Sequence, residues 1–493
     1  MRSNQSDRSQ IGMWFVLPLN IAYAPQRAKE AGHVPLLDYY EGCDPEIVLQ
    51  ELAMMRRAGV EFITFSKCPP AAFEGDRWTH LFMKALELQP ADERPLKGCI
   101  ILEDYCKSPN AQEAKKAADY IYANWAQQDY YFRYRGKPLL LIFWDPKRLE
   151  PGWADWQEDR FTVLFFQDRE KGGEGWSAWG SYPKTESKCW MTAMPGADNT
   201  VERAMAQATV LERADVLDED KQLVMTPTVY GRGDGEFFRK SLEYAWQKQP
   251  DIVYVLTWND WVSGTHVEPS KEDGYLYVDI MADVVGAADP KKDPLQVDKQ
   301  LVSRLQTELD LITERICTHN YRYFRKTIRV GKDISKASLE IAAQDAYRLF
   351  INGKLVAREN RGWTKIGNID ISEHLLVGDN VIAVEVDDWG KFIYLVFAVV
   401  KGAAGLILSG SIEHDDGERT EFVSDGTWKI SAEAEQSWTE CDFSDAAWPN
   451  ASVLGKASDP RWEILHKGFN DGRANWIWSD KQDTAQRRIS DGR

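Results

Sequence analysis

Residues 12–285 alternate short apolar runs with longer amphipathic segments. The apolar runs are nearly continuous in hydrophobicity, as strands buried on both faces of a sheet are. Between the first two runs, DPEIVLQELAMMRRAG has the Asp44-Pro45 helix start signal and stops at Gly59. The predicted strands are MWFVLPLN from Met13, VEFITFS from Val60, KGCIILED from Lys97, KPLLLIFW from Lys137, FTVLFFQ from Phe161, CWMTAM from Cys189, LVMTPT from Leu223 and DIVYVLTW from Asp251.

Eight strand and helix units within about 275 residues predict an α/β fold of the TIM, or (β/α)₈, barrel type. A doubly wound open sheet is the alternative. No glycine-rich phosphate loop follows the first predicted strand, so we favour the barrel.

The pattern changes after residue 286, and we expect three segments: 1–286, 287–319 and 320–485. The middle segment contains the linker-like GAADPKKDPLQ and a helical run, DKQLVSRLQTELDLITERI, that should pack against the barrel. The last segment has short alternating runs separated by turns such as Asn352-Gly353 and Asp416-Gly417. This spacing predicts an all-β jelly-roll sandwich of the galactose-binding type.

Composition narrows the partners and the compartment. The 493 residues include 77 acidic and 60 basic side chains, for a net charge of −17, which disfavours nucleic acid. No apolar stretch reaches the ~20 residues that span a bilayer, so no membrane partner is expected. Seven scattered cysteines without a CxxC pair indicate free thiols, with neither a metal nor a cofactor. Without a recognisable signal peptide we expect a cytoplasmic protein, or a periplasmic or secreted one if a leader was removed. The oligomeric state is left open.

Acidic and aromatic residues recur at the ends of the predicted strands, where barrel enzymes carry their chemistry. An acidic residue there can also simply cap the next helix. Twenty tryptophans fit either sugar-stacking clefts or large cores. The residues at these strand ends are Lys67, Glu103, Asp104, Trp144, Asp145, Asp168, Asp198, Asn199, Tyr230, Asn259 and Asp260.

The segment TWNDWVSGTHVEP, from Thr257 to Pro269, resembles the last-strand signature of glycoside hydrolase families 99 and 71. VPLLDYYEGCDPE, ILEDY, MPGADNT and GEFFRKSLEYAW agree with that pattern in the same order. The resemblance implies a barrel that cleaves α-linked glucans or mannans with two acids three positions apart. Asp260 matches the first acid, whereas Ser263 stands at the second position and cannot donate a proton as a carboxylic acid does.

Three interpretations follow from this departure. In the first, which we favour, the protein is a hydrolase in which Asp260 acts as base or charge-stabilising carboxylate, with Glu268 or Glu103 as second acid. In the second, the barrel binds a glycan without cleaving it. In the third, it carries out lyase or transferase chemistry on a glycan. The candidate substrate-binding residues are Asn259, Trp258, Trp261, Tyr40, Asp104, Trp144, Asp145, Asp198, Tyr230 and His266.

The C-terminal segment, with AYRLFINGKLVA, DISEHLLVGDNVIAVEV and ANWIWSD, is similar to the sandwich of bacterial α-L-rhamnosidases related to family 67 carbohydrate-binding modules. This similarity implies sugar binding by exposed rings such as Trp363 and Trp389. The alternative is that tryptophans such as Trp428 and Trp448 fill a core. The expected substrate is therefore an α-mannan, an α-glucan or a rhamnose-containing glycan.

Overall fold

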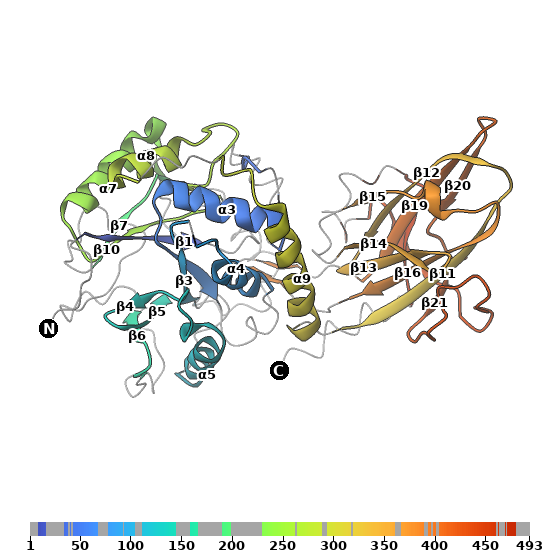
Figure 1. The fold of residues 1–493 in the computed structure, drawn as a ribbon, viewed down its shortest axis with the longest axis horizontal. Coiled ribbons are helices and arrows are strands. Elements are labelled where there is room, and N and C mark those ends of the chain that lie inside the picture. The colour runs from blue at the N-terminus through green and yellow to red at the C-terminus, as the bar shows by residue number, and fades with distance from the viewer. Residues whose placement is uncertain are drawn as a thin grey trace, which may run out of the picture. The chain divides into compact units, whose positions relative to one another are not determined.

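The computed structural model divides the chain into two compact units, residues 1–316 with 394–399, and residues 317–393 with 400–493 (Figure 1). The described residues are 8–15, 34–37, 40, 43–67, 77–91, 93–103, 111–143, 158–165, 190–198, 229–261, 264–287, 293–316, 319–359, 366–388, 393–395, 398–400, 404–459, 462, 469 and 471–479.

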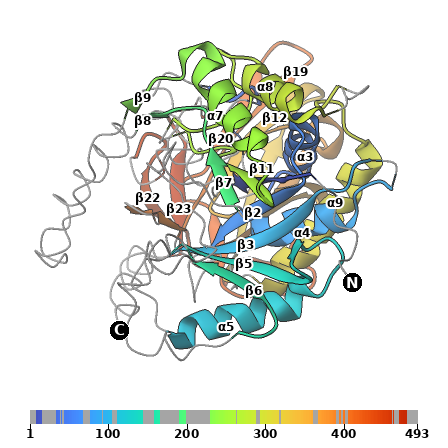
Figure 2. The same cartoon turned by 90° about the vertical axis from the view of Figure 1, so that its left-hand side faces the viewer.

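A parallel sheet organises the first unit, in the order β6-β5-β3-β2-β1-β10-β7 (Figure 2). These strands overlap seven of the eight predicted runs, with β1 starting three residues earlier than predicted, and the remaining run, LVMTPT, lies outside the described residues. A short β4 (Arg133–Tyr134) adds antiparallel to β5. The parallel strands are β1 (Gln10–Phe15), β2 (Phe62–Lys67), β3 (Lys97–Glu103), β5 (Lys137–Phe143), β6 (Thr162–Phe165), β7 (Trp190–Ala193) and β10 (Ile252–Val255).

The sheet differs from the regular eight-stranded order at β10. This strand pairs with β1 along one edge and with β7 along the other, so the sixth and eighth predicted strands are direct neighbours. A strand pairs along two edges only, and both edges of β10 are occupied. What the described residues show is a curled parallel sheet.

One face of this sheet is filled by aromatic and hydroxyl side chains in adjacent strands. Gly12 pairs with Phe62, and the Phe62 ring occupies the space where a Gly12 side chain would lie. The hydroxyl groups of Thr64 and Tyr254 are hydrogen-bonded, and the Trp14 indole donates to Ser66 at 2.6 Å. These buried hydroxyl and indole groups thus have partners inside the sheet.

Helices cover the sheet and pack on one another, with α3 against α8 and α9, α4 against α9, and α7 against α8. The predicted signals bound α3: the Asp44 side chain accepts from the Glu46 amide at 3.0 Å, and Gly59 ends the helix with φ 89°. The helices are α3 (Pro45–Ala58), α4 (Arg77–Glu87), α5 (Ala111–Ile121), α7 (Glu236–Gln247), α8 (Leu276–Val285) and α9 (Lys299–Ile316).

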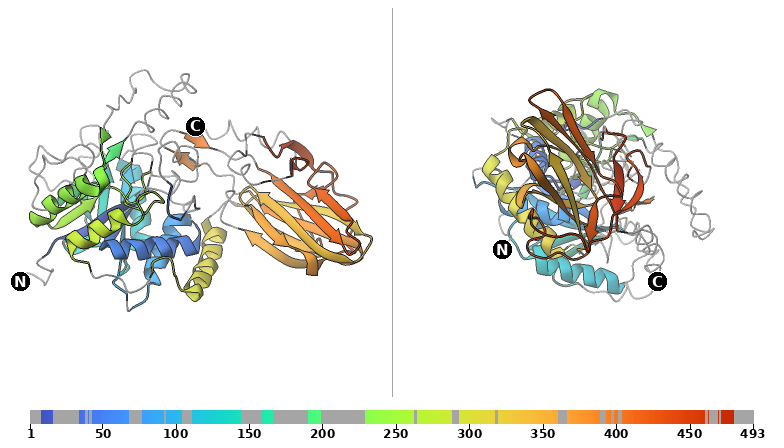
Figure 3. Two further views of the ribbon diagram at one scale, coloured as in Figure 1. Left: turned by 90° about the horizontal axis from the view of Figure 1, so that it is seen from above. Right: turned by 90° about the vertical axis from the view of Figure 1, so that its right-hand side faces the viewer.

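Two antiparallel sheets form the second unit, in the orders β14-β13-β16-β11-β21 and β15-β12-β19-β23-β22, with β20 on β19 (Figure 3). Side chains from both sheets share one buried core. The main strands are β11 (Tyr321–Val330), β12 (Ile334–Ala343), β13 (Ala346–Ile351), β14 (Lys354–Glu359), β15 (Gly367–Asp370), β16 (Gly378–Asp387), β19 (Leu406–His414), β20 (Arg419–Val423), β21 (Lys429–Ser431), β22 (Ser452–Lys456) and β23 (Asn475–Trp478).

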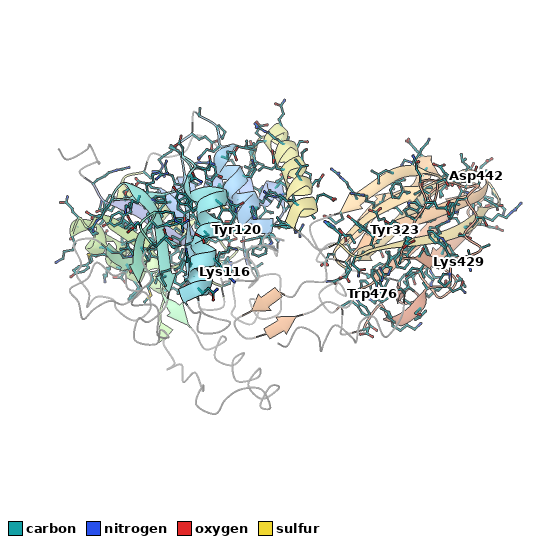
Figure 4. All side chains as sticks on the ribbon, turned by 90° about the horizontal axis from the view of Figure 1, so that it is seen from below. Lys116, Tyr120, Tyr323, Lys429, Asp442 and Trp476 are labelled. Carbon is teal, nitrogen blue, oxygen red and sulfur yellow. The ribbon has the colours of Figure 1, made fainter. Side chains whose placement is uncertain are left out.

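Tryptophans of the second unit contribute to its core. Trp428, Trp476 and Trp478 are buried between the sheets, with Trp476 labelled in Figure 4. Trp448 packs half-buried in a separate aromatic cluster. The two rings expected to bind sugar, Trp363 and Trp389, lie outside the described residues.

Gly12→Ala is expected to destabilise the first unit by about 1–3 kcal/mol through overpacking. The added Cβ would lie 2.3 Å from the Phe62 ring, which stacks on Phe132 with centroids 3.8 Å apart and so has little room to move. Urea unfolding followed by tryptophan fluorescence measures the effect. Gly231→Ala is the control, because its new Cβ meets nothing within 4 Å. Equal midpoints for both variants would contradict the packing argument.

Candidate functional site

The candidate site is built on the loop 257–268, which follows β10 and folds back on itself. The Thr257 amide donates to the Thr265 carbonyl at 2.9 Å, and the Val267 amide donates back to Thr257 at 3.0 Å. The Glu268 amide donates to the Trp258 carbonyl at 2.8 Å. These bonds place the two ends of the loop side by side at the carboxyl end of β10.

The segment 34–37 joins the same loop from the other side. Its backbone exchanges two hydrogen bonds of 2.8 Å with residues 269–271, and Pro35 and Ser270 form an antiparallel bridge. This pairing brings Tyr40, which lies just beyond the segment, next to Glu268. Residues separated by more than 200 positions therefore contribute to one cluster.

Arg232, which precedes α7, anchors the middle of the loop. Its guanidinium donates to the carbonyls of Gly264 at 2.9 Å and His266 at 3.0 Å. It also donates to the Tyr277 hydroxyl at 3.1 Å and lies over the Tyr277 ring. The mostly buried Arg232 side chain thus satisfies two loop carbonyls that lie outside regular secondary structure.

Two buried carboxyl groups lie beneath the loop. Glu268 Oε2 accepts from the Tyr40 hydroxyl at 3.0 Å and from the Trp261 indole at 2.9 Å. Glu51 Oε2, which comes from α3, accepts from the Trp258 indole. Tyr40 and the two carboxyl groups also interact with one another. The site therefore holds two acids and a phenol connected by hydrogen bonds.

Burial controls the acidity of these groups. It raises the pKa of Glu51 from 4.5 to about 7, against the lowering effect of hydrogen bonds from Tyr40 and Trp258. Burial, followed by the nearby Glu51 charge, raises the pKa of Glu268 well above its ordinary value. The pKa of Tyr40 is likewise raised, by burial first and then by the two acids. Burial therefore favours the protonated form of both acids.

Asn259 and Asp260 lie along the chain between Trp258 and Trp261, the two residues whose indoles bind the buried carboxyl groups. Asn259 is 1% exposed, and neither its amide nitrogen nor its amide oxygen has a hydrogen-bond partner among the described residues. Asp260 is 7% exposed, and its backbone amide donates to the Thr257 hydroxyl at 3.0 Å. A buried amide without partners is costly unless something else binds it, so Asn259 marks a place for a polar ligand group.

The structure brings together seven of the predicted site residues. They are Tyr40, Trp258, Asn259, Asp260, Trp261, His266 and Glu268, and His266 stacks on Trp261 with ring centroids 3.8 Å apart.

The side chains of the other predicted site residues lie outside the described part of the structure. Glu103 is the last residue of β3, but its side chain is not described. Asp198 in β8 (Ala197–Asp198) and Tyr230 in β9 (Val229–Tyr230) belong to two short strands that pair antiparallel. Asp104, Trp144, Asp145 and Ser263 lie outside the described residues.

The two indoles of the site are buried. Trp258 and Trp261 are 0% and 1% exposed, and each donates its N–H to a carboxylate. In this arrangement their rings contact protein and hold the acids in place. Sugar stacking on them stays a prediction, and it requires a change in the covering side chains.

The sequence analysis missed Glu51. Its signal is a charged residue on the apolar face of a helix, since Val48, Met54 and Met55 lie three or four positions away and are all buried. A glutamate is almost never fully buried unless it is paired. Its position in that pattern therefore indicated a buried partner.

Metal binding and membrane crossing receive no support from the described residues. No group of three or more His, Cys, Asp or Glu side chains there is placed to hold a metal ion. The helices in the same ranges also include none with the length and apolar character needed to cross a bilayer.

Comparison with known proteins gives partial matches. No protein-family profile matches the chain. An α-L-rhamnosidase of Streptomyces avermitilis is 33% identical over 147 residues, which cover 29% of this chain but 13% of the rhamnosidase. The crystal structure of S. avermitilis α-L-rhamnosidase with L-rhamnose matches 29% of this chain and 14% of its own at 30% identity, with a TM-score of 0.26. The GH99 endo-α-mannosidase of Bacteroides thetaiotaomicron matches 52% and 85% of the two chains at 17% identity, with a TM-score of 0.39.

Arg232→Met, which retains an apolar stem but no donor, is expected to loosen the loop. Each carbonyl left without a donor should cost about 1–3 kcal/mol. Hydrogen exchange at the amides of Thr257, Thr265 and Val267 measures the change. The control is Arg239→Met, which removes an exposed ion pair with Asp283 worth about 0–1 kcal/mol. If exchange in the loop is equally slow in both variants, the anchoring role of Arg232 is wrong.

Proposed function

We propose that the protein is a glycoside hydrolase whose chemistry centres on Asp260 and Glu268. The observation that carries the proposal is the buried Glu268 carboxyl with its raised pKa, in the same short loop as Asp260. Glycosidic cleavage needs one acid that keeps its proton near neutrality and a second carboxylate that stays ionised. Glu268, five residues after Ser263, then supplies the acid that a serine cannot provide.

The division of roles follows from the surroundings of each acid. Glu268, buried beside a second carboxyl group, favours its protonated form and is suited to protonating the departing glycosidic oxygen. Asp260 is the base or charge-stabilising carboxylate. Delivery of the proton requires the substrate to reach Glu268, which is 1% exposed, so the covering side chains must move when a sugar enters.

Asn259 is proposed to bind a sugar hydroxyl. Its amide has a donor and an acceptor that no described residue satisfies, and a hydroxyl group can satisfy both at once. Because Asn259 precedes Asp260 directly, a hydroxyl held by the amide would fix the sugar ring beside the carboxylate.

The proposed substrate is an α-mannan, an α-glucan or a rhamnose-containing glycan. Support comes from the resemblance of residues 257–269 to families 99 and 71, and from the 33% identity over 147 residues to an α-L-rhamnosidase. That match has the length of one unit rather than of the chain. The finer fold assignments that accompany the proposal are closure of the curled sheet into a barrel and a jelly-roll strand order in the second unit.

A non-catalytic glycan-binding protein is the second candidate. Ser263 favours it, because a serine stands where the resembling families have their second acid.

Asp260→Asn is expected to lower kcat by about 100- to 10,000-fold on any glycan that the wild type cleaves, because the ionised carboxylate is lost while the shape is kept. The assay is release of reducing sugar from a panel of α-mannans, α-glucans and rhamnose-containing glycans. Asp129→Asn, an exposed aspartate of the same unit, is the matched control and should leave kcat unchanged.

Two results would contradict this assignment. Full activity of Asp260→Asn would remove Asp260 from the chemistry. Absence of turnover on the whole panel, together with tryptophan fluorescence changes on adding a glycan, would establish the binding protein instead.

A further inference from the structure

Glu51 is buried on α3 with no role in the proposed reaction, although it lies against the acid that has one. Its Oε2 accepts from the Trp258 indole, while Oε2 of Glu268 accepts from Tyr40 and Trp261. The second oxygen of each acid, Oε1 in both, is buried and meets no N–H or O–H donor of protein among the described residues. Each acid therefore has one buried carboxyl oxygen that accepts no hydrogen bond from a described residue.

The two carboxyl groups lie close enough to influence each other's ionisation, and neither has a proton to donate when both are ionised. Two ionised carboxylates buried side by side would repel each other strongly. Among the described residues, no arginine or lysine forms an ion pair with Glu51 or Glu268 that would offset this repulsion. A single proton between the groups removes the repulsion and satisfies the leftover acceptors.

We infer that Glu51 and Glu268 hold one proton between them, as a carboxylic acid bonded to a carboxylate, and that Glu51 is a positioning residue for the loop that carries Asp260. The pair joins α3 to the loop 257–268, and each acid also holds the indole of one loop tryptophan. The part of this inference that concerns catalysis rests on the proposed hydrolase function, whereas the proton pair does not.

The pair sets a direction for the pH dependence of stability. The pKa of Glu51 is 4.5 in the unfolded chain and about 7 in the folded protein. Between these two pH values the folded protein therefore keeps a proton that the unfolded chain has lost. Stability is therefore fully present below pH 4.5 and is lost as the pH rises through this window. Among the described residues, Tyr40, whose pKa is raised, is a further titratable group in contact with the pair, while Asp260 and His266 are titratable residues of the same loop.

Infrared spectroscopy of the full-length protein without substrate tests the pair directly. The wild type at pH 7 is expected to show the carbonyl band of an un-ionised carboxylic acid, shifted in D₂O. Both Glu51→Gln and Glu268→Gln should lose this band, since an amide can donate to the remaining carboxylate. Glu46→Gln is the matched control: Glu46 lies on the same helix but is partly exposed and pairs with Lys299, so the band should remain. Absence of the band from the wild type, or its persistence in both variants, would overturn the inference.

Urea unfolding across the same pH range gives a second readout. For one shared proton the unfolding equilibrium constant of the wild type should rise by up to roughly tenfold per pH unit, relative to Glu51→Gln, between pH 4.5 and 7. Parallel curves for the two proteins would contradict the shared proton. Because the infrared band is measured on the wild type itself, the test survives if a variant fails to fold.

Activity separates this inference from the proposed function. If the protein is a hydrolase, Glu51→Gln should move the basic limb of the kcat/KM profile to lower pH, because a neutral amide holds the Glu268 proton less firmly. A band without any turnover leaves the pair in place and removes the hydrolase proposal. Turnover without the infrared band removes the shared proton and leaves the hydrolase proposal in place.

Discussion

Burial of the Glu268 carboxyl group is the interaction on which the site depends. A carboxyl group can leave water only if donors surround it, and here they come from separate parts of the chain. Tyr40 approaches before α3, Trp261 comes from the loop itself, and Glu51 lies on α3. Satisfying one buried acid therefore fixes the relative positions of the segment 34–40, the helix and the loop.

This arrangement links packing to chemistry. The same dry surroundings that require Tyr40 and Trp261 as donors also raise the pKa of Glu268, so one acid is kept protonated near neutrality. Asn259 and Asp260 lie on the same loop, which Arg232 holds through two carbonyls. An acid of raised pKa, a second carboxylate and an unsatisfied amide within one loop give the proposed hydrolase its physical basis.

Much of the fold followed from local patterns. Runs of buried apolar residues mark β2, β3 and β5, and the Asp44-Pro45 and Gly59 signals bound α3, because these features act over a few residues. The pairing of β10 with β7 could not be predicted from local patterns, because strands of similar hydrophobicity do not indicate which strands they pair with. Strand order is decided when the whole sheet packs, and the expected eight-strand order departs from the structure at that point.

The sequence by itself determined which chemical groups follow β10, because Asn259, Asp260 and Glu268 are close along the chain and need only a strand and a turn to come together. Only the tertiary structure decided that Glu51 lies against Glu268. The two are more than 200 positions apart, and their meeting depends on how α3 packs into the core of the first unit. Burial likewise arises only in the folded chain, so the proton affinity of both acids could not be obtained from their order in the sequence.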